Sequence, residues 1–335
     1  MNRFIFVDCT SVGEALNELD HGAVAKAGGI DLLDLMKDNI VSPPKLVNIR
    51  NVSALRGVDS SDKGLSLGPL TTLSELATHP AIRDKYTALA DSAGHAATPQ
   101  IRNMATLGGN VMQRSRCWYF RSEEFHCRRK GGSVCYAQEG ENQYHAIMHN
   151  HVCGMVHPSS TAVPLMAFGA QVELTSKKGK RTVPFETFYI PPEQSMMHDT
   201  VVEPGELITN IFVPVPKPGT RSAYQKYGDK ESFDWPIADA GVVLTMDGTR
   251  CKRAAIVLGA AAPTPIRAKQ AEALLAGKVI DETVARAAGK AAVAGATPLA
   301  NNGYKLQLFQ TAVYRTILLA AGQMDRDPSA IGGMA

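Results

Sequence analysis

Four of the six cysteines lie within one 37-residue stretch, at Cys117, Cys127, Cys135 and Cys153. Nine, seven and seventeen residues separate them in turn, so the stretch contains no C-x-x-C pair. Structural zinc sites usually use one short knuckle for each pair of ligands, and this spacing lacks one. Four thiolates at loose spacing suit a 4Fe-4S cluster, because a wrapping loop can supply each ligand separately. The stretch therefore predicts metal or redox chemistry, with unligated thiols as the alternative.

The residues around these cysteines carry weaker signals. The aromatic run Trp118-Tyr119-Phe120 directly follows the first cysteine and could shield a cluster from water. The triplet Arg128-Arg129-Lys130 is expected to be a solvated loop. A histidine could replace one cysteine ligand, but with four cysteines present we expect polar loop residues at His126, His145, His149, His151 and His157. The two isolated cysteines, Cys9 and Cys251, are expected to be small buried side chains.

Two Gly-Gly turns are candidate phosphate sites. The first is Gly28-Gly29, between a short apolar stretch and a helix-like segment, and the second lies within Thr106-Leu107-Gly108-Gly109-Asn110. Glycine allows the backbone to approach a pyrophosphate closely. Neither turn has the G-x-G-x-x-G spacing of a dinucleotide loop or the lysine of a Walker motif. Each alone also fits an ordinary turn, whereas the pair could hold the two ends of one diphosphate.

The elements that must position these residues change in character along the chain. The N-terminal half mixes short strands and helices, and a capping signal at Thr72 and Glu75 predicts that a helix begins there. Residues 82–97 read as one helix. From about residue 171 the pattern predicts a hairpin over 171–188, three further strands paired partly through Asp247-Gly248, an Ala-rich helical stretch over 265–294 interrupted at Gly277, and a last helix over 303–321.

Composition excludes several classes of function. The 335 residues are enough for two or three domains, with 44% hydrophobic and 20% charged residues. The net charge of +3 is too small to indicate a nucleic-acid partner. No run approaches the roughly 18 apolar residues of a membrane span, and the first twenty residues do not read as a signal peptide. No Ser/His/Asp set or carboxylate pair indicates a catalytic residue on this chain.

Several segments together resemble a known family. They are AGGIDLL, LGPLTTLSEL, IRNMATLGGN, YQKYGDKESFDWPIA and PTPIRAKQAEALLAGK. They are similar to the FAD-binding middle subunit of the molybdenum hydroxylases, the xanthine dehydrogenase and carbon monoxide dehydrogenase family, over residues 3–320. The cysteine stretch resembles the subset that carries an extra 4Fe-4S cluster, typified by the periplasmic aldehyde oxidoreductase and 4-hydroxybenzoyl-CoA reductase.

The resemblance implies an α+β fold with two domains. Residues 1–176 would form a two-subdomain FAD-binding domain of the vanillyl-alcohol-oxidase type, with an iron–sulfur loop inserted over residues 115–156. Residues 177–325 would form a smaller C-terminal domain of antiparallel sheet and helices. The resemblance also implies the cofactors FAD and a 4Fe-4S cluster, the latter held by the four clustered cysteines.

Roles for single residues follow from the resemblance alone. The FAD diphosphate would be wrapped by Lys26, Ala27, Gly28, Gly29, Ile30, Asp31, Leu32 and Leu33. Its other side would be closed by Thr106, Gly108, Gly109 and Asn110. Near the flavin would lie Ser115, Ser160, Ile208 and Lys226. Two positions depart from the family pattern: Ser160 stands where an aspartate is usual, and Lys230 stands where arginine is frequent, so the bidentate fork is lost.

The implied function is electron transfer within a heterotrimer. A large molybdopterin subunit would oxidise an aldehyde or an N-heterocycle, a small subunit would carry electrons through 2Fe-2S centres, and FAD in this chain would pass them to an external acceptor. The cluster would be a relay or a structural cross-link. The complex would be cytoplasmic, or periplasmic by export with a partner that carries a signal. Alternatives are a stand-alone flavin oxidase of the vanillyl-alcohol type and a cysteine-cluster metal-binding module without flavin.

Overall fold

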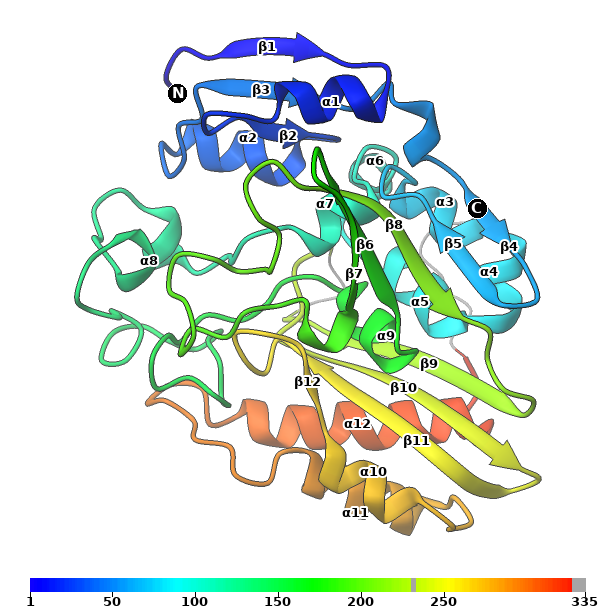
Figure 1. Ribbon diagram of the computed structural model, residues 1–335. Helices are drawn as coiled ribbons and strands as arrows, with labels where there is room; N and C mark the ends of the chain where they lie inside the picture. Colours follow the sequence, from blue (N-terminus) through cyan, green and yellow to red (C-terminus); the bar gives the residue numbers. More distant parts are fainter. Residues whose placement is uncertain (230–232, 327–335) are drawn as a thin grey trace.

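The computed structural model describes residues 1–229 and 233–326, and Figure 1 shows its three sheets one below another. The N-terminal sheet is parallel, with the strand order β1-β3-β2. Its elements are β1 (Ile5–Asp8), α1 (Val12–Glu18), β2 (Val24–Lys26), α2 (Ile30–Lys37) and β3 (Lys45–Asn48). Helix α1 begins where it does because Ser11 and Glu14 form a capping box.

The second sheet has five strands in the order β4-β5-β8-β6-β7. Its strands are β4 (Val58–Ser60), β5 (Gly64–Leu67), β6 (Gln171–Ser176), β7 (Gly179–Pro184) and β8 (Leu207–Pro214). The expected hairpin over 171–188 is confirmed by the pairing of β6 with β7, and Gly179 adopts the positive φ that its turn requires. The expected domain boundary after residue 176 falls between β6 and β7, which pair with each other. The division at this point stays a prediction.

Short helices lie between this sheet and the C-terminal sheet and enclose the central core, with α5 and α9 contacting the C-terminal sheet. They are α3 (Leu73–Thr78), α4 (Pro80–Lys85), α5 (Thr87–Gly94), α6 (Pro99–Arg102), α7 (Leu107–Val111) and α9 (Ala162–Ala167). The capping box of Thr72 and Glu75 starts α3 as expected. The single helix expected over 82–97 was wrong, because the chain leaves helical geometry at Tyr86. The buried Tyr86 ring packs into the core and its hydroxyl donates to the Pro214 carbonyl, 3.2 Å away.

The C-terminal sheet is antiparallel, with the order β12-β11-β10-β9. Its strands are β9 (Thr220–Tyr227), β10 (Ala238–Asp247), β11 (Arg250–Gly259) and β12 (Ile266–Arg267). Figure 1 shows three helices covering one face of it, namely α10 (Lys269–Leu275), α11 (Glu282–Ala292) and α12 (Lys305–Ala321). The Ala-rich stretch over 265–294 forms a short strand and two helices. The two helices are separated at Gly277, whose φ is +75°, as the sequence predicted. The expected turn at Asp247-Gly248 and the expected last helix are confirmed.

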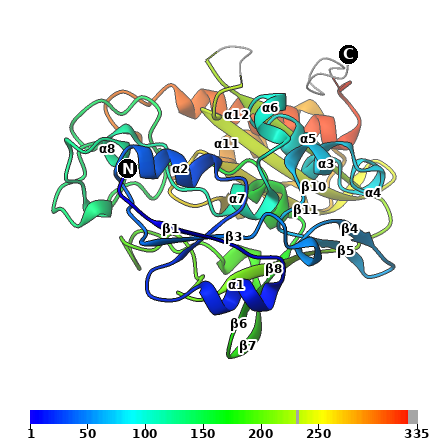
Figure 2. The same ribbon diagram turned by 90° about the horizontal axis from the view of Figure 1, so that it is seen from above.

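The cysteine segment lies to one side of the molecule, beside α2 in both views (Figures 1 and 2). It contains little regular structure, with α8 (Trp118–Arg121) and the 3-10 turn η2 (Arg128–Lys130) as its helical parts. Two other 3-10 turns are η1 (Ser53–Leu55) and η3 (Phe185–Thr187). Within the described residues, no helix is both long and apolar enough to cross a membrane. The mixed α+β architecture expected from the sequence is confirmed.

Candidate functional site

The first Gly-Gly turn joins β2 to α2 and contacts Met104 and Ala105, the two residues directly before the second turn. Gly29 is the residue that precedes α2, and its φ of +81° favours glycine. A Cβ added to Gly28 would lie 2.2 Å from the carbonyl oxygen of Met104. The two glycine segments, about 80 residues apart in sequence, are therefore in backbone contact because Gly28 has no side chain.

The second turn is fixed by its own hydrogen bonds. The Thr106 hydroxyl accepts from the amide of Gly109 at 3.2 Å and starts α7. The amide of Gly108 donates to the Pro69 carbonyl at 2.8 Å, and a Cβ on Gly108 would come within 3.0 Å of Pro69 atoms. Both glycine turns are thus preformed and adjacent, which is the arrangement expected of two sides of one diphosphate site.

The residues that flank the first turn differ in their surroundings. Ala27 packs against the N-terminal core, and Ile30 is an exposed apolar side chain. The ammonium of Lys26 lies 5.9 Å from the centre of the Phe6 ring, and the side chain of Leu33 approaches Gly29. Leu32 is partly buried.

Asp31 links the first glycine turn to the cysteine segment. Its carboxylate accepts from the amide of Arg114 at 2.8 Å. It also pairs with the guanidinium groups of Arg116 at 2.9 Å and Arg121 at 2.6 Å. All these charged side chains are at most 17% exposed. The Asp31 charge is therefore neutralised by arginines that flank Cys117, a role that its position in the sequence did not indicate.

Asn110 connects the second turn to the chain that follows the cysteines. Its Oδ1 accepts from the hydroxyls of Ser159 at 2.7 Å and Thr161 at 2.6 Å. Ser160, which lies between them in the sequence, is buried. Burial raises the pKa of Tyr224, and the Ser160 hydroxyl opposes that rise. The carboxamide of Asn110 thus holds residues 159–161 against α7, and Ser160 lies beside β9.

Behind Ser160 lies a buried acid. The Tyr224 hydroxyl donates to Asp239 Oδ2 at 2.9 Å, and Asp239 is 1% exposed. Burial raises the pKa of Asp239 to about 7, although Tyr224, Lys226 and Lys305 oppose that rise. The sequence reading missed Asp239 because an aspartate inside an apolar strand gives no local sign of its partners.

The last two expected flavin contacts lie on different strands. Lys226 on β9 is partly buried, and its ammonium donates to the carbonyls of His95 and Asp234, each at 2.8 Å. Burial lowers the pKa of Lys226, whereas Asp239 and Asp234 raise it. Ile208 on β8 is buried in the central core. Lys230, the family departure noted above, lies outside the described residues.

Ser115 lies at the entrance to the cysteine segment. Its hydroxyl accepts from the amide of Cys117 at 3.2 Å, and its carbonyl accepts from Arg121 Nε at 2.9 Å. Ser115 is 4% exposed, and its bond to the Cys117 amide holds the turn that presents Cys117.

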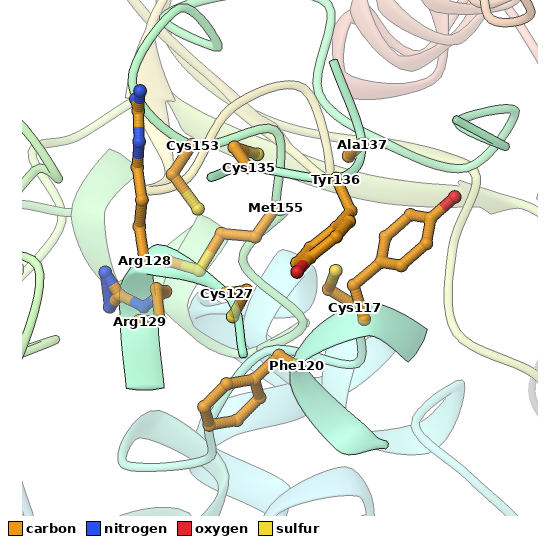
Figure 3. Close-up of a pocket in the computed structure, with 11 residues that line it drawn as sticks. Cys117, Phe120, Cys127, Arg128, Arg129, Cys135, Tyr136, Ala137, Cys153 and Met155 are labelled. Atoms are coloured by element: carbon orange, nitrogen blue, oxygen red, sulfur yellow. The ribbon is translucent and has the colours of Figure 1, made fainter. Parts of the chain in front are cut away.

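All four clustered cysteines line one cavity (Figure 3). Its empty volume is about 320 Å³, including the part open to solvent. Tyr119, Phe120 and Met155 also line it, so the aromatic run contributes two walls as expected. In the described parts of the chain, no group of three or more His, Cys, Asp or Glu side chains converges on a single metal ion.

The electrostatics of this cavity differ from one cysteine to the next. Burial raises the pKa of Cys117 to about 12. A hydrogen bond from Cys153 lowers the pKa of the Cys135 thiol, and the same bond raises that of Cys153. The amide of Gly154 also donates to Cys135 Sγ at 3.4 Å. Without metal, the buried pocket therefore disfavours four negative sulfurs together.

The prediction that Arg128-Arg129-Lys130 forms a solvated loop was wrong for Arg129, which is buried. Its side chain is 2% exposed, it pairs with Asp199, and the charges of Cys153, Cys127 and Cys117 act on it. Among the residues that the structure describes, Nη1 of Arg129 has no hydrogen-bond partner. The Asp199 carboxylate also pairs with Arg114, whose Nε lies 2.7 Å from Asp199 Oδ2. A buried cation thus stands beside the sulfurs, which no spacing rule could have found.

Comparison with known proteins identifies the family. Residues 2–216 match the model described as the FAD binding domain in molybdopterin dehydrogenase, and residues 222–320 match the CO dehydrogenase flavoprotein C-terminal domain. The chain belongs to the FAD-binding medium subunits of the molybdenum hydroxylases. It is accordingly an FAD-binding subunit of an oxidoreductase.

Individual relatives agree with this assignment. The aldehyde oxidoreductase FAD-binding subunit PaoB of Escherichia coli is 33% identical over 306 residues, which cover 90% of this chain and 92% of the relative. The carbon monoxide dehydrogenase medium chain of Hydrogenophaga pseudoflava is 29% identical over 96% of this chain and 94% of the relative. Carbon monoxide dehydrogenase from H. pseudoflava, as a solved structure, has a TM-score of 0.75 at 27% identity, covering 97% of this chain and 99% of that chain. Quinoline 2-oxidoreductase from Pseudomonas putida 86 gives the same TM-score, identity and coverage.

Proposed function

We propose that this medium subunit carries a 4Fe-4S cluster beside its FAD and transfers electrons within a heterotrimeric molybdenum hydroxylase. The observation that carries the proposal is the pairing of two preformed glycine turns with a four-cysteine cavity, joined through Asp31. A large molybdopterin subunit and a small 2Fe-2S subunit would complete the assembly, which could be doubled. The similarity to PaoB favours an aldehyde as the substrate class of the complex.

The residues that we propose for FAD are those of the two turns and the strands behind them. Residues 26–33 and the Thr106–Asn110 turn are proposed to enclose the diphosphate, because Gly28 lets the backbone of the first turn approach the residues directly before the second. Lys226 supplies a positive charge, and the His95 and Asp234 carbonyls occupy two of its three N–H donors. For the remaining side of the site we propose Ser115, Ser160 and Ile208, all of which are buried. FAD, when bound, supplies exchange of electrons between one-electron centres and the external acceptor.

The cysteine cavity fits a cluster better than a single ion. Each iron of a cubane takes one thiolate, so its four ligands surround a space instead of converging on one point. The four cysteines line such a space. The buried guanidinium of Arg129 favours the negative charge that four thiolates bring. Tyr119, Phe120 and Met155 add apolar surface to the same space, and limiting the access of water is one way in which a protein adjusts the potential of a buried centre.

The position of the cluster supports both a relay and a structural cross-link. The segment over residues 115–156 is long for a loop of a compact domain, so four ligands would fasten it. Asp31 also attaches its beginning to the first glycine turn through Arg116 and Arg121. This attachment supports a cluster close to the proposed diphosphate site.

The test uses the purified complex with iron and flavin assays. We expect Cys135→Ser to lose the four irons assigned to this chain while FAD is retained, because the glycine turns do not include Cys135. Cys251→Ala is the matched control, since that buried cysteine lies in β11, away from the cavity. Equal iron content in both variants would exclude Cys135 as a ligand. Zinc in place of iron would contradict the cluster itself, and turnover of substrate by this chain alone would indicate a stand-alone oxidase.

A further inference from the structure

A buried histidine contacts one of the proposed cluster ligands. Nε2 of His145 lies 3.2 Å from Cys117 Sγ, within hydrogen-bond range for sulfur. His145 is 3% exposed, although the sequence suggested a polar loop residue. The contact crosses 28 residues of chain, so the fold and not local sequence produces it.

His145 is held in place both through its ring and through its backbone carbonyl. The centre of its ring lies 4.9 Å from that of Trp118 in an edge arrangement and 5.9 Å from that of Tyr119. Its carbonyl accepts from Nζ of Lys305 at 3.0 Å and from Nδ2 of Asn302 at 3.1 Å. The start of α12 in the C-terminal domain therefore fixes where His145 meets the sulfur.

The direction of the hydrogen bond follows from the chemistry of the ligand. A free Cys117 thiol can donate to a bare Nε2, but a sulfur bound to iron has no proton to give. A lone pair on Nε2 would then face the negative sulfur and repel it. The ring nitrogen must carry hydrogen in the loaded protein, whichever charge the imidazole has.

We infer that His145 is a positioning residue that donates its Nε2–H to the iron-bound sulfur of Cys117 and raises the reduction potential of the cluster. Hydrogen bonds to the sulfurs are one factor that sets the reduction potential of an iron–sulfur cluster. They raise it because they stabilise the reduced state, which carries more negative charge. This inference rests on the proposed cluster. It adds that the C-terminal domain, through Asn302 and Lys305, controls the electronic environment of a centre in the other part of the chain.

The test is a redox titration of the whole complex, followed by the electron paramagnetic resonance signal of the reduced cluster. In His145→Leu we expect the equilibrium constant for one-electron reduction to fall about tenfold, which is ~59 mV toward negative potential. His145→Gln retains an N–H donor, so its potential should lie between those of the other two proteins. His151→Leu is the matched control, because the His151 side chain is in the same segment but 71% exposed.

The outcomes separate the two proposals. Absence of iron from the wild-type complex would contradict the cluster and leave the FAD assignment intact. Full iron with an unchanged potential in His145→Leu would overturn the role of His145. If His145→Leu assembles no cluster, wild-type protein with ¹⁵N-histidine decides, because a nitrogen in this hydrogen bond should couple to the reduced cluster. That coupling should vanish in His145→Gln, and its absence from wild type would overturn the inference.

Discussion

The contact of Gly28 with the backbone directly before the second glycine turn makes Gly28→Ala the sharpest test of the flavin site. The added methyl would lie 2.2 Å from the Met104 carbonyl oxygen and 3.0 Å from its carbon. An ordinary contact needs about 3.4 Å, so the two backbones must separate by about 1.2 Å. Neither contact atom belongs to a flexible side chain, and therefore the turns themselves must move apart.

The expected loss can be given a magnitude. Forcing an extra methyl into a packed site costs about 1–3 kcal/mol. If that cost falls on the bound geometry of the two turns, FAD affinity should decrease about 5- to 140-fold, since ~1.4 kcal/mol is a factor of ten. The assay is FAD titration of flavin-depleted complex, read by quenching of flavin fluorescence, with the melting temperature measured in parallel.

A matched control separates the site from the fold. Gly13 lies in α1, and a Cβ there would meet no heavy atom within 4 Å among the described residues. Gly13→Ala should leave FAD affinity unchanged and stabilise the helix by about 0.5–1 kcal/mol. Wild-type affinity in Gly28→Ala would refute the reasoning that contact between the turns forms the diphosphate site.

Three further variants test the charged groups. Asp31→Asn should destabilise the protein by about 1.5–3 kcal/mol and weaken the binding of both FAD and iron, measured by thermal unfolding and cofactor content. Asp34→Asn is the control: its side chain is 57% exposed, so stability should change by at most ~0.5 kcal/mol. Arg129→Gln should shift the cluster to more negative potential in a redox titration, because a buried cation beside its sulfurs is removed; an unchanged potential would contradict the proposed charge balance. Asp239→Asn tests pH dependence: because burial raises the pKa of Asp239 to about 7, the folded protein holds a proton that the unfolded chain releases near pH 4. Wild-type stability should therefore fall relative to Asp239→Asn as pH rises from about 4 to 7 and then level off, and denaturant unfolding that showed a constant difference would exclude this titration.

Signals that act over a few residues were readable before the structure. The hydroxyl of Thr72 and the carboxylate of Glu75 start a helix because they satisfy amides within one turn. The Asp247-Gly248 pair predicts a hairpin because glycine accepts the required backbone geometry. Gly277 ends α10 for the same conformational reason. Such features depend on neighbouring residues, so the sequence is sufficient to predict them.

The sequence also indicated which residues with possible chemical roles lie close together along the chain. Four cysteines in 37 positions predicted metal or redox chemistry, and the fold brings all four to one cavity. Two Gly-Gly turns indicate close backbone approach. The sequence did not show that the Gly28 turn touches Met104, which only the folded chain brings beside it.

The surroundings of charged and polar side chains were decided by tertiary structure. Arg129 and His145 lie in a segment that reads as a polar loop, yet both are buried against the cysteine sulfurs. Asp31 follows a glycine turn, yet its charge is neutralised by arginines more than 80 residues later in the chain. Burying a charge is costly unless a partner is present, and each of these partners comes from a distant segment. The sequence by itself therefore determined which groups this protein has for chemistry, and the fold decided which of them act on one another.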